Sequence, residues 1–237
     1  MAKNIVLLHG WGAGPGKLEL LAGALRKLGW AVVIPTLPGL SGSGPGGVWG
    51  VGDYARRVEA KLPRNFRPQG YVVFGHSFGG RVAIKLGAHQ VEGLRGIVLC
   101  AAGGLSRPWS FKRVVFWVLA KLGKLLMIYP PLAVIYRRLL YGAAREHDYE
   151  KTSGVMRETF KKVVAEILVG DLSKIKVSTL ILWGKQDRTV PYHDGVLANQ
   201  KITKSKLVLV EGQGHRLPYE MPDYLASQIN IWFGSLR

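Results

Sequence analysis

Ser77 stands in a sequence context that fits a nucleophile. It is the centre of the pentapeptide GHSFG at 75–79, which follows the apolar run 71–74 and precedes a segment compatible with a helix. A G-x-S-x-G serine between a strand and a helix lies in a strained turn, and the flanking glycines leave room for that turn. The N-terminus of the following helix would point unpaired N–H groups and a positive dipole toward a developing oxyanion. Ser77 is therefore the candidate nucleophile.

An acid and a base follow Ser77 in the chain. Asp187 comes shortly after the apolar run 177–183, and His215 comes shortly after the run 206–211. If both runs are parallel strands, the order Ser, Asp, His brings three distant residues to one edge of one sheet. A lone Asp in a turn is usually a turn former, and a lone His near a glycine is usually exposed. Three independent coincidences of position nevertheless favour a catalytic set.

A doubly wound α/β fold would position these residues. The apolar runs predict a mainly parallel sheet of about six strands, because each run suits a strand buried on both faces and helices or loops separate them. A (β/α)-barrel is excluded because its eight repeats would not fit. We expect a helix at 52–62 with Asp53 as its N-cap or first-turn acid, and a turn at 63–70. The other expected elements are strands at 5–8, 30–34, 71–74, 96–101, 177–183 and 206–211, and helices at 17–28, 81–86 and 222–233.

The glycine-dense loop at 9–14 follows the first expected strand, at the edge where open parallel sheets bind their ligands. A phosphate-binding loop is the rival interpretation. The spacing of the glycines matches neither G-x-x-x-x-G-K-[ST] nor G-x-G-x-x-G.

Residues 105–170 differ from the rest of the chain. We expect no buried strand there, and we interpret the segment as a helical cap, or lid, inserted into a core domain formed by 1–104 and 171–237. Residues 107–145 contain eight Lys and Arg and no acid. Three interpretations stay open: the solvated face of a packed lid, weak contact with an anionic membrane surface, and recognition of an anionic substrate. A membrane span is excluded, because the longest uncharged stretch, 125–136, carries two prolines and falls short of about 20 residues.

Composition narrows the class of protein. The chain has 237 residues, and 33 Lys and Arg against 15 Asp and Glu give a net charge of +18. No zinc-ligand spacing, RNA-binding aromatic signature or helix-turn-helix pattern accompanies this charge, so we expect no nucleic-acid partner. The single cysteine, Cys100, excludes an internal disulfide framework and suits a buried packing role. The N-terminus lacks the pattern of a secretory signal, so we expect a cytoplasmic protein.

Over nearly its whole length the chain resembles the α/β-hydrolase family. The matching pieces are HGWG (9–12), GHSFGG (75–80), WGKQDRTVP (183–191) and GQGHRLPYEMP (212–222). The resemblance implies a triad of Ser77, Asp187 and His215, an oxyanion hole from the backbone N–H groups of Trp11 and Phe78, and a helical cap. The chain departs from the family in beginning where the third strand would be, and in lacking an aspartate before the Leu-Pro-Gly at 37–39. Dehalogenase relatives are excluded, because they need a carboxylate at the position of Ser77.

The implied activity is hydrolysis of carboxylic esters through an acyl-enzyme, without a metal or cofactor, on small to medium or aromatic acyl substrates. Carbon–carbon bond hydrolysis, thioester hydrolysis, acyl transfer, lipase-like activity and a non-hydrolytic ligand-binding role stay open as alternatives. His9 and His76 lie close to the predicted nucleophile, and we assign them supporting or packing roles. The expected substrate pocket is lined by His9, Trp109, Phe116, Trp117 and Tyr136.

Overall fold

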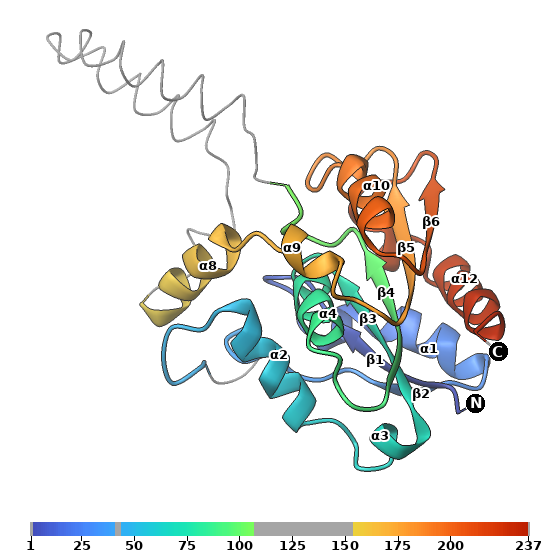
Figure 1. The fold of residues 1–237 in the computed structure, drawn as a ribbon, viewed down its shortest axis with the longest axis horizontal. Helices are drawn as coiled ribbons and strands as arrows, with labels where there is room; N and C mark the ends of the chain where they lie inside the picture. Colours follow the sequence, from blue (N-terminus) through green and yellow to red (C-terminus); the bar gives the residue numbers. More distant parts are fainter. Residues whose placement is uncertain (1, 41–43, 107–153, 237) are drawn as a thin grey trace, which may run out of the picture. The chain divides into compact units, whose positions relative to one another are not determined.

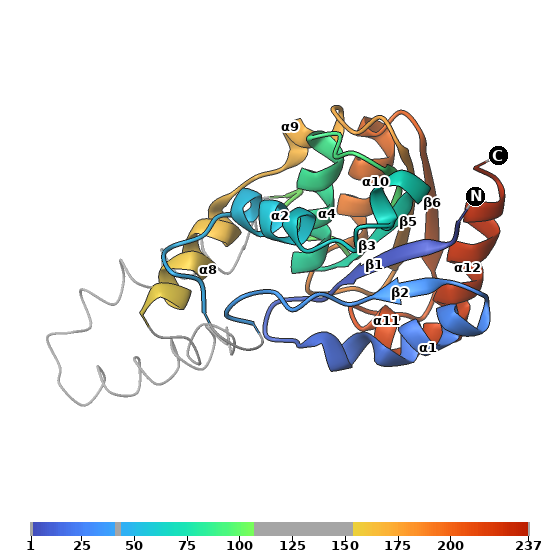
Figure 2. The ribbon, with the colours of Figure 1, turned by 90° about the horizontal axis from the view of Figure 1, so that it is seen from below.

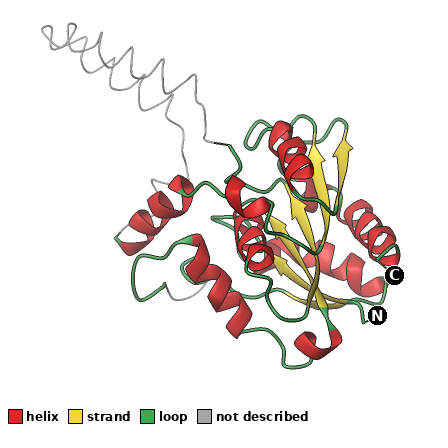
Figure 3. Cartoon of the chain, viewed as in Figure 1, coloured by secondary structure: helices red, strands yellow, loops and turns green. Residues whose placement is uncertain are grey.

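A six-stranded parallel sheet organises the part of the chain that the computed structural model describes, which is residues 2–40, 44–106 and 154–236 (Figures 1 and 3). The strand order is β2-β1-β3-β4-β5-β6, and every neighbouring pair is parallel. The predicted doubly wound α/β fold is thus confirmed. The strands are β1 (Asn4–Leu8), β2 (Ala31–Val33), β3 (Tyr71–His76), β4 (Leu94–Cys100), β5 (Ser178–Gly184) and β6 (Ser205–Val210).

The order of the strands creates a switch point between β1 and β3. The chain leaves β1 toward β2 at one edge, then returns to β3 on the other side of β1 and continues outward to β6. The loops that follow β1 and β3 therefore diverge, and open sheets of this type bind ligands in the resulting crevice at the carboxyl ends. The HGWG loop follows β1 and Ser77 follows β3.

Helices cover both faces of the sheet, which explains why its strands are continuous apolar runs rather than alternating ones (Figure 2). On one face pack α1 (Glu19–Lys27) and α12 (Pro222–Gly234). On the other face pack α2 (Val51–Ala60), α4 (Phe78–Ala88), α9 (Val169–Leu172) and α10 (Tyr192–Lys201). The remaining helices are the 3-10 helix η1 (Pro15–Leu18), α3 (Phe66–Gln69), α8 (Val155–Ala165) and α11 (Leu217–Glu220).

Local details differ from the sequence predictions at helix ends. The helix expected from residue 17 begins at Glu19, after the 3-10 turn that Pro15 opens. Asp53 is not the N-cap of α2 but its first-turn acid: the N-cap is Gly50, whose N–H donates to Asp53 Oδ2 at 2.8 Å. The segment 63–70, expected to be only a turn, contains the short helix α3.

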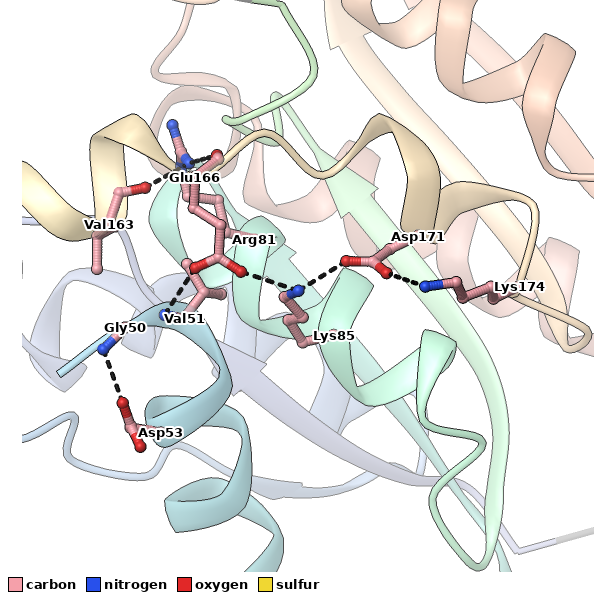
Figure 4. Close-up of polar contacts among 9 residues, drawn as sticks. All are labelled: Gly50, Val51, Asp53, Arg81, Lys85, Val163, Glu166, Asp171 and Lys174. Atoms are coloured by element: carbon pink, nitrogen blue, oxygen red, sulfur yellow. Dashed lines mark hydrogen bonds and ion pairs between the residues drawn. The ribbon is translucent and has the colours of Figure 1, made fainter.

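Two cations on α4 hold the segment that contains α8 and α9, which belongs to the same compact unit as the sheet (Figure 4). Arg81 donates to the carbonyl oxygens of Val163 (2.7 Å) and Glu166 (2.9 Å), at the C-terminal end of α8. Lys85 bridges the carboxylates of Glu166 (2.8 Å) and Asp171 (2.7 Å). Burial lowers the pKa of Arg81 to about 10, so its charge persists at neutral pH.

The predicted cap, 105–170, is described only at its ends, and its boundaries stay a prediction. The pocket residues predicted within it, namely Trp109, Phe116, Trp117 and Tyr136, lie outside the described residues, as does most of the basic segment. In the described ranges, no helix combines the length and the apolar character that crossing a membrane requires.

Cys100 ends β4 and is fully buried between neighbouring strands. Burial raises the pKa of its thiol, because the thiolate would lose its hydration in that position. Its backbone carbonyl accepts the N–H of Ser77 at 3.1 Å, so the end of β4 is tied to the turn that follows β3.

Candidate active site

Ser77 lies in a strained turn between β3 and α4. Its φ of 53° and ψ of −110° place a non-glycine residue in a conformation that L-residues rarely adopt. Such strain costs on the order of 1–3 kcal/mol and persists only where the surroundings enforce it. Here the Ser77 carbonyl accepts the N–H groups of Gly80 (3.1 Å) and Gly103 (3.0 Å), while its own N–H is bonded to Cys100. As a whole residue, Ser77 is partly buried.

The glycines of the pentapeptide are required by close backbone approaches. A Cβ on Gly75 would overlap the carbonyl group of Gly79, and a Cβ on Gly79 would overlap the carbonyl group of Leu8 in β1. The first turn of α4 therefore rests directly on the backbone of two strands, with no side chains between them. This contact supports the sharp turn at Ser77.

Asp187 follows β5 in a tight turn that its own side chain stabilises. Its Oδ1 atom accepts the backbone N–H groups of Thr189 (2.8 Å) and Val190 (2.9 Å). The indole of Trp183, at the end of β5, donates to the Val190 carbonyl at 2.9 Å and fixes the far side of the turn. With Oδ1 so engaged, Oδ2 is directed toward the loop after β6.

His215 forms a hydrogen bond with that second carboxylate oxygen. Its Nδ1 atom lies 2.8 Å from Asp187 Oδ2. Because a carboxylate oxygen only accepts, Nδ1 carries the hydrogen, and in the neutral ring Nε2 carries the lone pair. This tautomer is the one that can take a proton from a serine. The two loops are also joined through their backbones, since Gln186 N–H donates to the Gln213 carbonyl at 2.9 Å.

The two residues predicted to form an oxyanion hole lie beside Ser77. Phe78 is the first residue of α4, where helix N–H groups have no partner within the helix. Trp11 follows Gly10, and a Cβ built on Gly10 would be 3.4 Å from the Ser77 Cβ. The Trp11 ring contacts the rings of Phe78 (centroids 5.2 Å apart) and Phe160 of α8 (5.1 Å). One aromatic cluster thus connects the loop after β1 to α4 and α8.

Comparison with protein families decides the class. A family model described as "Alpha/beta hydrolase family" matches residues 5–228. The chain belongs to the alpha/beta hydrolase family. The six parallel strands and the placement of Ser77, Asp187 and His215 at their carboxyl ends agree with this membership.

Individual alpha/beta hydrolases resemble this chain over different spans. The uncharacterized hydrolase YugF of Bacillus subtilis is 25% identical over 67% of this chain and 63% of its own length. The monoacylglycerol lipase ABHD6 of Rattus norvegicus is 34% identical over 31% of this chain and 26% of its own. The chain therefore spans less than two thirds of either relative. In the crystal structure of the esterase EaEST from Exiguobacterium antarcticum, the fold is similar with a TM-score of 0.72, at 20% identity, over 98% of this chain and 92% of that one.

The three histidines near Ser77 differ in their surroundings. His9 has no exposed surface and donates from Nδ1 to the Gly10 carbonyl (3.0 Å), and burial lowers its pKa. His76 is buried against His215, with ring centroids 4.9 Å apart. Tyr219, which sequence reasoning did not single out, donates its hydroxyl to His76. Its position four residues after His215, on the short helix α11, is the signal that could have drawn attention to it.

Among the residues that the structure describes, no three His, Cys, Asp or Glu side chains are grouped so as to hold a metal ion. The Ser77 hydroxyl, the Asp187 carboxylate and the His215 imidazole follow β3, β5 and β6, respectively.

Proposed function

We propose that this alpha/beta hydrolase is a serine esterase that cleaves carboxylic esters with apolar acyl groups through an acyl-enzyme intermediate. The observation that carries the proposal is the bond between Asp187 Oδ2 and His215 Nδ1, which leaves the basic Nε2 of His215 free of its proton. It occurs at the same sheet edge as Ser77, a serine held at a φ of 53°. A serine nucleophile and a histidine that can take its proton are the two side chains that this chemistry needs first.

The proposed reaction begins when Ser77 Oγ attacks the ester carbonyl carbon and His215 Nε2 takes the hydroxyl proton. Asp187 stabilises the imidazolium without accepting its proton. The tetrahedral intermediate then expels the alcohol, which receives the proton from His215. Water, activated by the same imidazole, attacks the acyl-enzyme and releases the carboxylic acid and Ser77.

The negative charge on the tetrahedral oxygen would be stabilised by the backbone N–H groups of Trp11 and Phe78. Removal of one such donor in other enzymes costs about 3 kcal/mol of transition-state stabilisation. Because both donors are main-chain groups, no side-chain substitution removes them directly. The position of the Phe78 N–H depends instead on Gly79, which allows the first turn of α4 to lie against the Leu8 carbonyl of β1.

An apolar acyl group is supported by the aromatic cluster of Trp11, Phe78 and Phe160. Trp11 is partly exposed, so part of its apolar surface remains available to a substrate. The similarity to a monoacylglycerol lipase over 86 residues points in the same direction. Each methylene buried against such a surface contributes at most about 0.8 kcal/mol, which corresponds to about a fourfold rise in kcat/KM.

The test combines turnover with covalent labelling. Purified protein should hydrolyse p-nitrophenyl butyrate with a burst of p-nitrophenol, and a fluorophosphonate should add once, at the peptide that contains Ser77. Ser77→Ala should abolish both signals while the fold is retained, and a chelator should leave turnover unchanged. Ser173→Ala is the matched control, since Ser173 is exposed and lies before β5, whereas Asp187 follows the opposite end of that strand. An active Ser77→Ala protein would refute the proposal.

A series of p-nitrophenyl esters from acetate to decanoate addresses the acyl group. We expect kcat/KM to rise with chain length until the apolar surface is filled. A flat profile would remove the apolar acyl group from the proposal while leaving the serine chemistry intact. Thioesters and vinylogous diketones, assayed beside the esters, separate ester hydrolysis from thioester and carbon–carbon bond cleavage.

A further inference from the structure

The side chains of Tyr219 and His76 and the backbone carbonyl of His215 form a partly buried series of hydrogen bonds next to the predicted nucleophile in sequence. His76 Nε2 lies 2.9 Å from the backbone carbonyl oxygen of His215, and the Tyr219 hydroxyl lies 3.2 Å from His76 Nδ1. His76 is only 2% exposed, and its ring also meets the Tyr219 ring edge-on, with centroids 5.2 Å apart. His76 is the residue immediately before Ser77, so this series joins the peptide of the nucleophile to the peptide of the base.

The positions of the protons follow from the acceptors. A carbonyl oxygen only accepts, so His76 Nε2 must carry a hydrogen and donate it to His215. The pKa of His76 is lowered to about 3, chiefly by burial and also by the nearby His215 and His9, against the opposing effects of the bond to the His215 carbonyl and of Asp187. The ring is therefore neutral, and Nδ1 holds a lone pair. Burial raises the pKa of Tyr219 to about 12, so its hydroxyl keeps the hydrogen that it donates to that lone pair.

His215 is thus held at two separate points. Asp187 holds the imidazole through Nδ1, and His76 holds the main chain through the carbonyl oxygen. A ring held only at Nδ1 could still move with its backbone, because the loop after β6 lies at the edge of the sheet. His76 ends β3, which lies between β1 and β4, and it is itself paired with Cys100 of β4.

We propose that His76 and Tyr219 are positioning residues: Tyr219, together with the His215 carbonyl, holds His76 in its Nε2–H tautomer, and His76 in that form holds the His215 backbone so that its imidazole meets Ser77. The proposal rests on the proposed function, in which His215 is the general base. Tyr219 engages Nδ1 of His76 as Asp187 engages Nδ1 of His215, but Tyr219 donates to that nitrogen whereas Asp187 accepts from it. The two imidazoles thereby carry their hydrogens on opposite nitrogens.

The first experiment compares kcat and KM for p-nitrophenyl butyrate in four variants. Tyr219→Phe removes one hydroxyl and should lower kcat about tenfold, since His76 can then adopt the other tautomer and lose its bond to His215. His76→Leu removes the donor and should lower kcat about 100-fold, as expected when a catalytic group is displaced by about 1 Å. His76→Gln keeps an amide N–H near the position of Nε2 and should recover most of that loss. KM should stay within twofold of wild type in all of these variants. The control Tyr224→Phe changes a tyrosine of α12 that is not part of the hydrogen bonds between Tyr219, His76 and His215, and it should match wild type.

A double substitution separates tautomer selection from simple packing. Glutamine has no tautomers, so adding Tyr219→Phe to His76→Gln should change kcat less than twofold, whereas the same change in the wild-type background costs about tenfold. Equal losses in both backgrounds would overturn the role assigned to Tyr219. A His76→Gln protein as inactive as His76→Leu, or losses confined to KM, would overturn the role assigned to His76.

A second experiment needs no turnover. Side-chain ¹⁵N NMR reports which imidazole nitrogen carries the hydrogen, so wild type should show His76 as the Nε2–H tautomer and Tyr219→Phe should show a mixture. If the wild-type protein hydrolyses no ester and takes no fluorophosphonate, the proposed function fails, yet this measurement still decides whether Tyr219 selects the tautomer. An unchanged His76 spectrum in Tyr219→Phe would overturn the proposal whatever the activity.

Discussion

Asp187 Oδ2 lies 2.8 Å from His215 Nδ1, and the Asp187 side chain is wholly shielded from solvent while that of His215 is 19% exposed. Asp187→Asn would place an amide where three groups now donate to the carboxylate: two backbone N–H groups and His215 Nδ1. Its oxygen can satisfy the N–H groups of Thr189 and Val190, which leaves the NH₂ group facing Nδ1. His215 must then accept at Nδ1 and carry its hydrogen on Nε2, where it cannot take the serine proton. We expect kcat for p-nitrophenyl butyrate to fall roughly 10³- to 10⁴-fold.

The control for this change is Asp223→Asn, which alters an exposed aspartate in the first turn of α12. It should leave kcat within twofold of wild type. Circular dichroism and the urea midpoint should show that Asp187→Asn remains folded, since the amide replaces the carboxylate with the same shape. Wild-type kcat in a folded Asp187→Asn protein would exclude Asp187 from the catalytic set.

Gly79→Ala should destabilise the fold by about 2 kcal/mol or more, because its Cβ would overlap the Leu8 carbonyl in β1. Gly23→Ala is the matched control, as the same change is made inside α1 with no atom within 4 Å of the new Cβ. It should stabilise the protein by about 0.4–1 kcal/mol. Urea unfolding of the three proteins measures both effects. Equal midpoints for Gly79→Ala and wild type would show that α4 can move away from β1 at little cost.

His76 should make stability depend on pH below neutrality. Burial lowers its folded pKa from 6.5 to about 3, with His215 and His9 adding to the shift and Asp187 opposing it. Between these values the unfolded chain binds a proton that the folded chain does not, so the free energy of unfolding decreases as pH falls from 6.5 toward 3. The contribution is at most about 1.4 kcal/mol per pH unit.

Urea midpoints between pH 4 and 7 measure this slope. His76→Gln removes the titrating group and should give a shallower dependence than wild type. His89→Gln, at the exposed C-terminal end of α4, is the control and should keep the wild-type slope. If wild type and His76→Gln respond to pH equally, then His76 is protonated in the folded protein at the same pH as in the unfolded chain.

Arg81→Met should cost on the order of 2 kcal/mol of stability, because the carbonyl groups of Val163 and Glu166 would lose a partly buried charged donor. Arg26→Met tests an exposed arginine instead, whose ion pair with Glu19 has side chains 48% and 55% exposed. That change should cost less than about 1 kcal/mol. A thermal or urea denaturation series compares the two. A smaller loss for Arg81→Met than for Arg26→Met would mean that water replaces the guanidinium at the end of α8.

Periodicity and composition were sufficient to predict the sheet, because strands buried on both faces are continuous apolar runs. The run 71–74 correctly located β3, although the strand continues to His76. That extension was not predictable from hydrophobicity, since glycine is a poor strand former and the extension depends on pairing with β1 at Gly75 and with β4 at Gly75 and His76. Membership of the alpha/beta hydrolase family was likewise accessible from four short motifs, while the triad and oxyanion residues stay predictions that this geometry supports.

Contacts between distant segments were beyond the reach of sequence reasoning. Tyr219 and His76 are 143 positions apart, and no local pattern relates them. Arg81 resembles any exposed helical arginine in the sequence, yet it is directed at the end of α8. The predicted cap, 105–170, includes α8 and the start of α9, and no pattern in the sequence indicates that Arg81 and Lys85 of α4 bond to that part of the chain. Such relationships depend on how elements pack, which hydrophobic periodicity does not encode.

The burial of Cys100 makes its chemical modification a measure of how often the sheet opens. Only a thiolate reacts with alkylating or disulfide reagents, and the raised pKa and full burial of this thiol keep it inert in the closed sheet. Cys100 is the single cysteine of the chain, so the rate of its modification reports how frequently β4 separates from β3 and β5. Because its carbonyl also holds the Ser77 N–H, each such event disrupts the nucleophile turn. The labelling rate therefore sets a lower limit on the rate at which the turn at Ser77 opens and re-forms.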